Sequence, residues 1–197
     1  MQKKAGRRQP QQRRARQTVE AVLDAVVRIL KRDGVGAVTT NRIAEVAGVS
    51  IGSVYQYFPD KRAIFAALHE RHVAEIDRLV ERTLVEHAAA PLGGAVGAMV
   101  EAHAADPELH ELLMSEVPHR AAGSRAFSVR LHGAFRLAIG ARAGEIKRRR
   151  DLDLVVFVVA NMVEALAHGA VLRRPAGVGL AAAKAEAVRA VLAYLRG

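Results

Sequence analysis

The sequence predicts an all-α protein of about nine helices, and three observations support this fold class. Apolar residues make up 51% of the 197 residues, whereas aromatic residues make up only 4%. Alanine, the strongest helix former, is the most frequent apolar residue, and the alternating β-branched runs that are typical of strands are scarce. The mean hydropathy of +0.07 indicates a folded chain, long enough to bury a sizeable core.

Composition also argues against several classes of protein. The chain contains no cysteine, which excludes disulfides, thiolate chemistry and cysteine-ligated zinc. The basic N-terminus is not followed by the apolar segment of a signal peptide. The longest apolar run, residues 154–160, is followed by Asn161 and Glu164 and is too short to span a bilayer. We therefore expect a cytoplasmic protein that does not use a membrane.

The first predicted helix extends from about Gln17 to Arg32 and has a continuous apolar stripe with helical spacing. Asp33-Gly34 is expected to end it. The stripe residues are Val19, Val22, Leu23, Val26, Val27 and Leu30. We expect this helix to support the segment that follows it.

Residues 39–58 have the pattern of two short helices around a tight turn. Thr39 or Thr40 can cap the first helix, because a threonine oxygen accepts from the unpaired amides of the first turn. Gly48 can end it, since glycine adopts the left-handed conformation without a side-chain clash. Ser50 can then cap the second helix. Two short helices joined by a glycine turn are typical of a helix-turn-helix motif.

The second of these helices has two distinct faces. Val54 and Phe58 are four residues apart and are expected to share the buried face. The outward residues are Gly52, Ser53 and Gln56, with Tyr55 on the flank. A polar and aromatic outer face suits contact with a nucleic acid, although the alternative that Tyr55 and Tyr57 are ordinary core aromatics remains open.

The motif TT-x-x-IA-x-x-AGVS-x-G-S-x-Y-x-YF-x-x-K, in residues 39–61, resembles the DNA-binding domain of the tetracycline repressor (TetR) family. The resemblance extends from about Arg16 to His69. The family often has a polar or charged residue where this chain has Ile51. The resemblance implies a transcriptional regulator, a repressor in most members, that binds a roughly palindromic DNA operator as a homodimer and is released by a small-molecule effector.

The residue types at this motif suit two kinds of DNA contact. Helix N-termini, hydroxyls and phenols bind phosphate oxygens, whereas Gln56 can pair with an adenine edge and Gly52 permits close approach. The resemblance places Asn41 beside a base. The candidate DNA-binding residues are Arg13, Arg14, Arg16, Thr39, Thr40, Asn41, Ser50, Ile51, Gly52, Ser53, Tyr55, Gln56, Tyr57 and Lys61.

Three of these candidates lie in a strongly basic N-terminal segment. Residues 1–16 contain seven Lys or Arg residues and no acid, so they contribute +7 of the formal net charge of +10. Such a segment is expected to be disordered alone but attracted to phosphates. It is either a solubilising tail or an arm whose Arg13, Arg14 and Arg16 enter a narrow minor groove.

We predict three parts of the chain: a disordered basic arm (residues 1–16), a helix-turn-helix domain (17–69) and a C-terminal effector-binding and dimerisation domain (70–197). A long helix from Lys61 to about Ala89 is shared by the two domains. The family resemblance implies that this helix transmits effector binding to the DNA-binding domain.

Further helices are predicted in the C-terminal domain. Asp106-Pro107 is a helix start, with Asp as cap and Pro in the first turn. The expected helices are 95–105, after a break at 90–94, then 107–117, 124–146, a very apolar helix from Asp151 or Asp153 to 173, and 180–196. The cationic run 147–150 either offsets a helix C-terminus or makes a second DNA contact.

The last two helices are predicted to form a four-helix interface with a second copy of the chain. Residues 163–175, VEALAHGAVLRRP, also resemble one C-terminal subgroup of these regulators. The candidate interface residues are Glu164, His168, Val188, Val191, Leu192 and Leu195.

A ligand pocket inside the C-terminal domain is expected, because helical bundles host such sites. Helical phase alone nominates Met99, His103, Met114, Phe127, Arg130, Phe157 and Asn161. Glu164 and His168 have the i, i+4 spacing of metal ligands, but no third ligand is evident, so we expect no metal and no cofactor. Motifs of hydrolases, phosphate loops and zinc proteases are absent, and we expect no enzyme.

Overall fold

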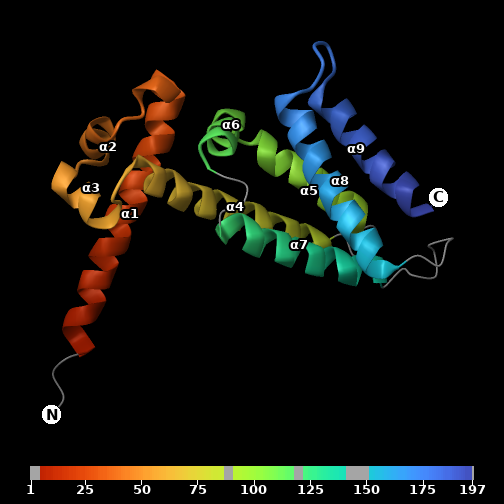
Figure 1. Cartoon of the computed structure of the whole chain (residues 1–197), viewed down its shortest axis with the longest axis horizontal. Helices are drawn as coiled ribbons and strands as arrows, with labels where there is room; N and C mark the ends of the chain where they lie inside the picture. Colours follow the sequence, from red (N-terminus) through yellow and green to blue (C-terminus); the bar gives the residue numbers. More distant parts are fainter. Residues whose placement is uncertain (1–4, 87–90, 118–121, 141–150, 197) are drawn as a thin grey trace. The chain divides into compact units, whose positions relative to one another are not determined.

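The computed structural model describes residues 5–86, 91–117, 122–140 and 151–196, and all regular structure in these ranges is helical (Figure 1). The elements are α1 (Ala5–Asp33), the 3₁₀ helix η1 (Val35–Ala37), α2 (Thr40–Ala47), α3 (Ile51–Tyr57), α4 (Lys61–Glu86), α5 (Pro91–Ala104), α6 (Pro107–Glu116), α7 (Ala122–Gly140), α8 (Leu152–Leu172) and α9 (Leu180–Arg196). Nine α-helices in these ranges confirm the predicted all-α fold class.

The chain divides into two compact units. The N-terminal unit comprises the residues up to His69 together with the second half of α6, from Leu112. The C-terminal unit comprises Glu70–Glu111 and the chain from residue 119 onward. The first division falls inside α4, so this long helix contributes its first turns to one unit and its later turns to the other.

The core of the N-terminal unit is built on the apolar stripe of α1. Helix α1 packs against α2, which in turn packs against α3, and Figure 1 shows these short helices beside it. The buried side chains include Val22, Val26, Ile29, Ile43, Val54, Phe58 and Phe65. Four of the six residues of the stripe predicted for the first helix are buried, namely Val22, Leu23, Val26 and Leu30, while Val19 and Val27 are half-buried. Val54 and Phe58 fix the inner face of α3 as expected.

Helix α1 begins at Ala5, twelve residues before the predicted start at Gln17. Most of the segment predicted to be a disordered arm is thus helical in the structure. A local reason applies to the turns after Pro10: Arg, Gln and Ala are good helix formers, and a helix already nucleated by packing of its later turns extends at little further cost. Pro10 itself lies within α1 and removes one backbone hydrogen bond. Net charge and low apolar content did not reveal this extension.

Helix α8 is the centre of the C-terminal unit. It contacts α5, α7 and α9, and α9 also packs against α5. The core cluster includes Val96, Met99, Phe135, Val159, Val163 and Val191. These side chains come from four helices, so α8 is covered by neighbours on several sides.

By length and composition alone, α8 could cross a membrane: its mean hydropathy over the most apolar window is 1.9. The apolar run 154–160 was expected to be too short to span a bilayer, whereas the whole helix is long enough. Seven of its residues are buried, and core helices of soluble proteins have the same composition. Packing within the unit thus accounts for part of its apolar character, since 39% of the most apolar window is buried.

The start of α5 corrects one prediction. A break was expected at residues 90–94, but the helix begins at Pro91 and includes Gly93. Proline is favoured in the first turn of a helix, where its missing N–H has no partner to lose. A Cβ added at Gly93 would lie 3.5 Å from Val188 Cγ1 of α9, which is an ordinary van der Waals contact.

Two predicted helix starts are confirmed. Asp106 Oδ1 accepts a hydrogen bond from Leu109 N at 3.2 Å at the start of α6. Asp151 Oδ1 accepts from Asp153 N at 2.9 Å and caps α8. The predicted helical residues 87–89 and 141–146 and the cationic run 147–150 lie outside the described part of the chain.

Candidate nucleic-acid interface

The turn between α2 and α3 has the caps that the sequence predicts. Thr39 is the N-cap of α2, and its Oγ1 accepts from Arg42 N at 3.3 Å. Gly48 ends the helix with φ 70° and ψ 30°, the left-handed conformation that favours glycine. Ser50 Oγ accepts from Ser53 N at 3.0 Å and caps α3. These contacts fix how α3 follows α2.

Helix α3 is held by one face and exposed on the other. Val54 and Phe58 are buried, which anchors the helix against the rest of the N-terminal unit. Tyr55 is 52% exposed and Ile51 38% exposed, while Gly52 and Gln56 are exposed as well. The outward orientation predicted for this face is therefore correct, and an ordinary core role for Tyr55 is excluded.

Three other candidates on or near this face are less accessible. Ser53 and Tyr57 are half-buried. The hydroxyls of Ser50 and Ser53 lie 2.8 Å apart and share a hydrogen bond. Each hydroxyl carries one donor and two acceptor positions, so both keep capacity for another partner. Thr40 is half-buried, whereas Asn41 is exposed.

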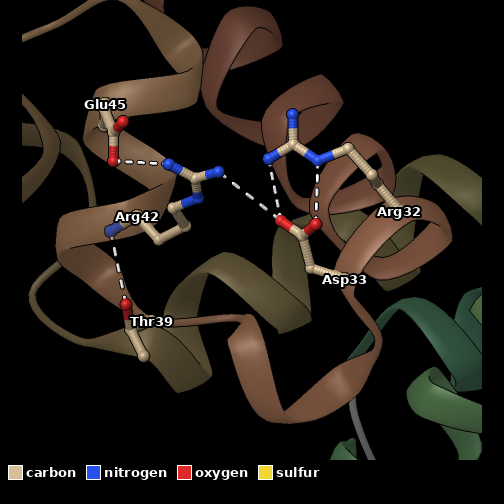
Figure 2. Close-up of polar contacts among 5 residues, drawn as sticks. All are labelled: Arg32, Asp33, Thr39, Arg42 and Glu45. Atoms are coloured by element: carbon tan, nitrogen blue, oxygen red, sulfur yellow. Dashed lines mark hydrogen bonds and ion pairs between the residues drawn. The ribbon is translucent and has the colours of Figure 1, made fainter.

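A charged network joins the end of α1 to the start of α2 (Figure 2). Arg32 donates two hydrogen bonds to Asp33, both at 2.8 Å. Asp33 also lies 3.6 Å from Arg42 Nη2, and Arg42 Nη1 lies 2.7 Å from Glu45 Oε2. Hydrogen bonding from the Arg32 guanidinium lowers the pKa of Asp33 from its ordinary value. Because these groups are exposed, the network adds little to the stability of the fold. Its main effect is to orient the start of α2 relative to the end of α1.

Lys61 was predicted to act as a point charge for phosphate. Its Nζ donates to the carbonyl of Val38 at 3.3 Å and lies 5.2 Å from the centre of the Phe65 ring. These contacts hold the start of α4 against the segment before α2. An ammonium group has three donors, so one contact with Val38 leaves donors for a phosphate.

The arginines of the basic segment lie on the surface of α1. Arg13, Arg14 and Arg16 are all exposed, and they are positioned by a helix rather than by an extended arm. A regular helix fixes the spacing of these charges, which an extended arm would leave variable.

Taken together, an exposed α3 on a buried anchor, a glycine turn and flanking positive charge define a helix-turn-helix DNA-binding protein. Residues 22–68 match the sequence profile of the bacterial regulatory proteins of the tetR family. Residues 88–195, more than half of the chain, match the tetracyclin repressor-like C-terminal domain. The chain belongs to the TetR family. Members of this family are DNA-binding transcriptional regulators that bind operators as dimers; they are generally not enzymes.

Curated relatives match a short part of the chain. The nucleoid occlusion factor SlmA of Actinobacillus pleuropneumoniae is 45% identical over 53 residues, which are 26% of this chain and 26% of SlmA. The chain thus matches about a quarter of the length of such curated relatives. Because the match is this short, the activity of SlmA is not transferred to this chain.

Two solved structures match most of the chain. The fatty acid degradation regulator FadR from Bacillus halodurans aligns with a TM-score of 0.68 at 18% identity, over 90% of this chain and 99% of FadR. SmeT, the repressor of a Stenotrophomonas maltophilia multidrug efflux pump, aligns with 0.65 at 23% identity, over 90% and 91%. SmeT is also known in complex with triclosan. At these identities, the likeness establishes the fold.

The residues nominated for a ligand pocket do not form one group. Met99 and His103 are buried in the C-terminal unit, Met114 is half-buried, and the side chain of Phe127 lies outside the described part. The prediction is wrong for two members: Phe157 is 56% exposed, and Asn161 is exposed with its Nδ2 donating to Phe157 O at 2.7 Å. Helical phase identifies one face of α8 but not which neighbour covers it.

Arg130 is also exposed, and it forms an ion pair with Asp77 of α4. That pair ties α7 to the later turns of α4, within the C-terminal unit. The contact gives Arg130 a structural partner at the surface instead of a place inside a pocket.

The residues nominated for a dimer interface fall into two sets. Val191 and Leu195 are buried in the core of their own chain, which corrects their assignment to a contact with a second copy. Val188 and Leu192 are half-buried. Glu164 and His168 are also half-buried, on α8. The stripe on α9 was identified correctly, but most of it is covered by α5 and α8.

One cluster was missed by sequence analysis. His103, His110 and His168 lie together in the C-terminal unit, each with a ring nitrogen within 4.8 Å of the others. His168 was considered with Glu164 as a pair, yet its close partners come from α5 and α6. These residues are on three helices, so no local spacing could have revealed the cluster. The helical phase that placed His103 on an inward face was the one available signal.

Proposed function

We propose that this chain is a sequence-specific transcriptional repressor that binds operator DNA through α3 and is released by a small-molecule effector. The observation that carries this proposal is α3 itself. Its buried anchors, Val54 and Phe58, hold an outer face on which Gly52, Tyr55 and Gln56 are exposed. A short helix with this polarity fits the major groove, which is wide enough for one α-helix.

The exposed groups suit two roles. Gln56 is proposed to contact a base edge, because an amide can donate to and accept from adenine. Tyr55, Lys61 and the arginines of α1 are proposed to contact phosphates, which fix position without reading sequence. Asn41 and Thr39, at the start of α2, are proposed to contact the adjacent backbone or a base.

A homodimer is proposed to present two copies of α3 to a roughly palindromic operator. Leu154 and Phe157 are 59% and 56% exposed on α8, and with Asn161 they have the i, i+3, i+7 spacing of one helix face. An exposed apolar face of this kind suits an interface between identical helices. We place the protein in the cytoplasm, where its operator DNA is found.

The effector is proposed to bind within the C-terminal unit. SmeT, which has the same fold, is known bound to triclosan, and residues 88–195 of this chain match the tetracyclin repressor-like C-terminal domain. A ligand that prefers the conformation with low DNA affinity would release the operator. No reaction is proposed for the protein.

Binding-site selection from random duplexes tests the DNA-binding role. Wild-type protein is expected to enrich a two-fold symmetric sequence, with binding that weakens steeply as salt increases. Gln56→Ala should relax the preference at one base position per half-site, by about 1–3 kcal/mol of discrimination. Glu75→Ala, an exposed change on α4 in the C-terminal unit, is the control. An unchanged selection profile in Gln56→Ala would exclude base reading by this residue.

A second candidate is a DNA-binding protein without a small-molecule effector. The observation in its favour is the similarity to SlmA, a nucleoid occlusion factor, although this is limited to 53 residues. A thermal-shift screen of small molecules separates the candidates. A compound that raises Tm and also weakens operator binding supports the effector; a protein partner that alters DNA binding while no compound does supports the alternative.

A further inference from the structure

Four histidines from four helices gather in the C-terminal unit. They are His72 on α4, His103 on α5, His110 on α6 and His168 on α8. Ring centroids of His103 and His110 are 4.3 Å apart, those of His103 and His168 4.9 Å, and those of His110 and His168 4.8 Å. The first three histidines are buried, and His168 is half-buried. Imidazole groups from four helices therefore meet at one place in this unit.

The arrangement of three of these rings matches the demands of a metal ion. One ring nitrogen each from His103, His110 and His168 lies within 4.8 Å of the other two. A tetrahedral ion with bonds of about 2.0–2.1 Å holds its nitrogen ligands roughly 3.3 Å apart. Small rotations of the rings, moving the nitrogens by about an ångström, would therefore bring all three to bonding distance.

The hydrogen bonding of His103 prepares it for this role. Its Nδ1 lies 2.6 Å from the carbonyl oxygen of Met99. A carbonyl can only accept, so Nδ1 carries the proton and Nε2 keeps its lone pair. Histidine ligands commonly have their second nitrogen fixed in this way by a backbone carbonyl.

We propose that His103, His110 and His168 bind one divalent transition-metal ion, of the class of Zn²⁺, Co²⁺ or Ni²⁺. Imidazole donors suit these ions, whereas Mg²⁺ and Ca²⁺ require oxygen donors. Three protein ligands leave a fourth position for water or for a donor atom of a small molecule. His72, whose ring centroid is 5.6 Å from that of His110, lies beside the site.

Such an ion would join helices that are separate in sequence. It would bond α5 and α6 to the central helix α8, and so would stabilise one arrangement of the C-terminal unit. This inference goes beyond the proposed function, because metal binding does not depend on the binding of DNA. The experiment below contains no DNA, so its failure would leave the proposed function standing.

The experiment titrates full-length protein, stripped of metal by a chelator, with Zn²⁺, Co²⁺, Ni²⁺ and Mg²⁺ in a calorimeter. We expect one transition-metal ion per chain, visible absorption bands of four-coordinate Co²⁺, and no binding of Mg²⁺. His110→Gln should weaken binding by more than about 100-fold, since even outer-shell partners of a ligand contribute about 10- to 100-fold. His132→Gln, a half-buried histidine of α7 outside the cluster, should bind as wild type.

X-ray absorption of the Zn²⁺-loaded wild-type protein keeps the test independent of how the variants fold. Three imidazole ligands are expected in its spectrum. The proposal is overturned if no transition-metal ion binds stoichiometrically, if fewer than two imidazoles surround the zinc, or if His132→Gln abolishes binding as His110→Gln does. Any of these results would identify the cluster as a hydrogen-bonded core feature.

Discussion

The two units of this chain differ in how far apart in the sequence the residues of their notable groups lie. In the N-terminal unit, the caps, the turn and the exposed face of α3 all lie within residues 39–58. In the C-terminal unit, His103, His110 and His168 come from three helices. A short, local motif can be interpreted residue by residue, whereas a site assembled by packing cannot.

The difference has a physical origin. Helix caps and glycine turns depend on hydrogen bonds to the backbone between residues a few positions apart. The core of the C-terminal unit depends on which face of α8 meets α5, α7 or α9. Sequence periodicity gives the faces of a helix but not the identity of the neighbours. Substitutions in the two units should therefore have different effects: those in the C-terminal core should mainly change stability, and those on α3 should mainly change DNA binding.

The largest effect is expected for Phe135→Ala. Phe135 is fully buried in the core of the C-terminal unit, so truncation should lower the free energy of unfolding by about 3–5 kcal/mol. Leu137→Ala, an exposed position on the same helix, should cost less than about 0.5 kcal/mol. Urea denaturation measures both. A comparable loss in Leu137→Ala would mean that the outer face of α7 is covered, for instance by a second copy.

Tyr55→Ala should weaken DNA binding at every operator sequence by about 10- to 100-fold, because a hydrogen bond to a charged group contributes about 1.5–3 kcal/mol. The free energy of unfolding should change little, since the side chain is half-exposed. Tyr55→Phe separates the hydroxyl from the ring. Fluorescence anisotropy with a selected duplex gives the affinities; wild-type affinity in both variants would remove Tyr55 from the interface.

Two glycines of the helix-turn-helix should respond in opposite directions. Gly48→Ala forces a side chain into φ 70° and should cost about 1–2 kcal/mol of stability. Gly52 has ordinary helical geometry with room for a methyl group, 3.8 Å from Ser50 Oγ, so Gly52→Ala should gain about 0.5–1 kcal/mol.

DNA binding distinguishes the two glycines further. If Gly52 faces the duplex, Gly52→Ala should weaken operator binding although the protein is more stable. Thermal unfolding and anisotropy on the same samples give both quantities. A more stable Gly52→Ala protein that binds DNA as wild type would show that α3 does not approach the bases at this position.

The smallest effect is expected for Asp33→Asn, in the network of Figure 2. Hydrogen bonding from Arg32 lowers the pKa of Asp33 in the folded state. The stabilisation is therefore present above the pKa of Asp33 in the unfolded chain, about 4. It is lost as the pH falls through the lower pKa that Asp33 has in the folded state. Urea unfolding at several pH values should show wild type and variant converging at acid pH. A constant difference across this range would contradict the prediction.

Much of the N-terminal unit could be predicted because each of its signals is local. Thr39, Gly48 and Ser50 occupy the predicted caps, and Val54 and Phe58 occupy the predicted inner face. The start of α1 was missed, because good helix formers such as Arg and Gln also occur in charged, disordered segments. Composition alone does not distinguish these states.

In the C-terminal unit, helix starts were predictable and helix environments were not. Asp106 and Asp151 cap the expected helices. Phe157 was expected inside and lies at the surface, while Val191 was expected at an interface and lies in the core. Both errors have one cause: an apolar stripe is equally suited to an internal neighbour and to a second copy.

The position of α9 has a consequence for synthesis. Its buried residues Ala187, Val191 and Leu195 complete a core whose other walls are α5 and α8. During translation those walls emerge from the ribosome first and stay uncovered until these last turns follow. A chain cut short before Val191 would expose valines of α8 to chaperones and proteases, so C-terminal nonsense mutations should deplete the protein rather than merely shorten it.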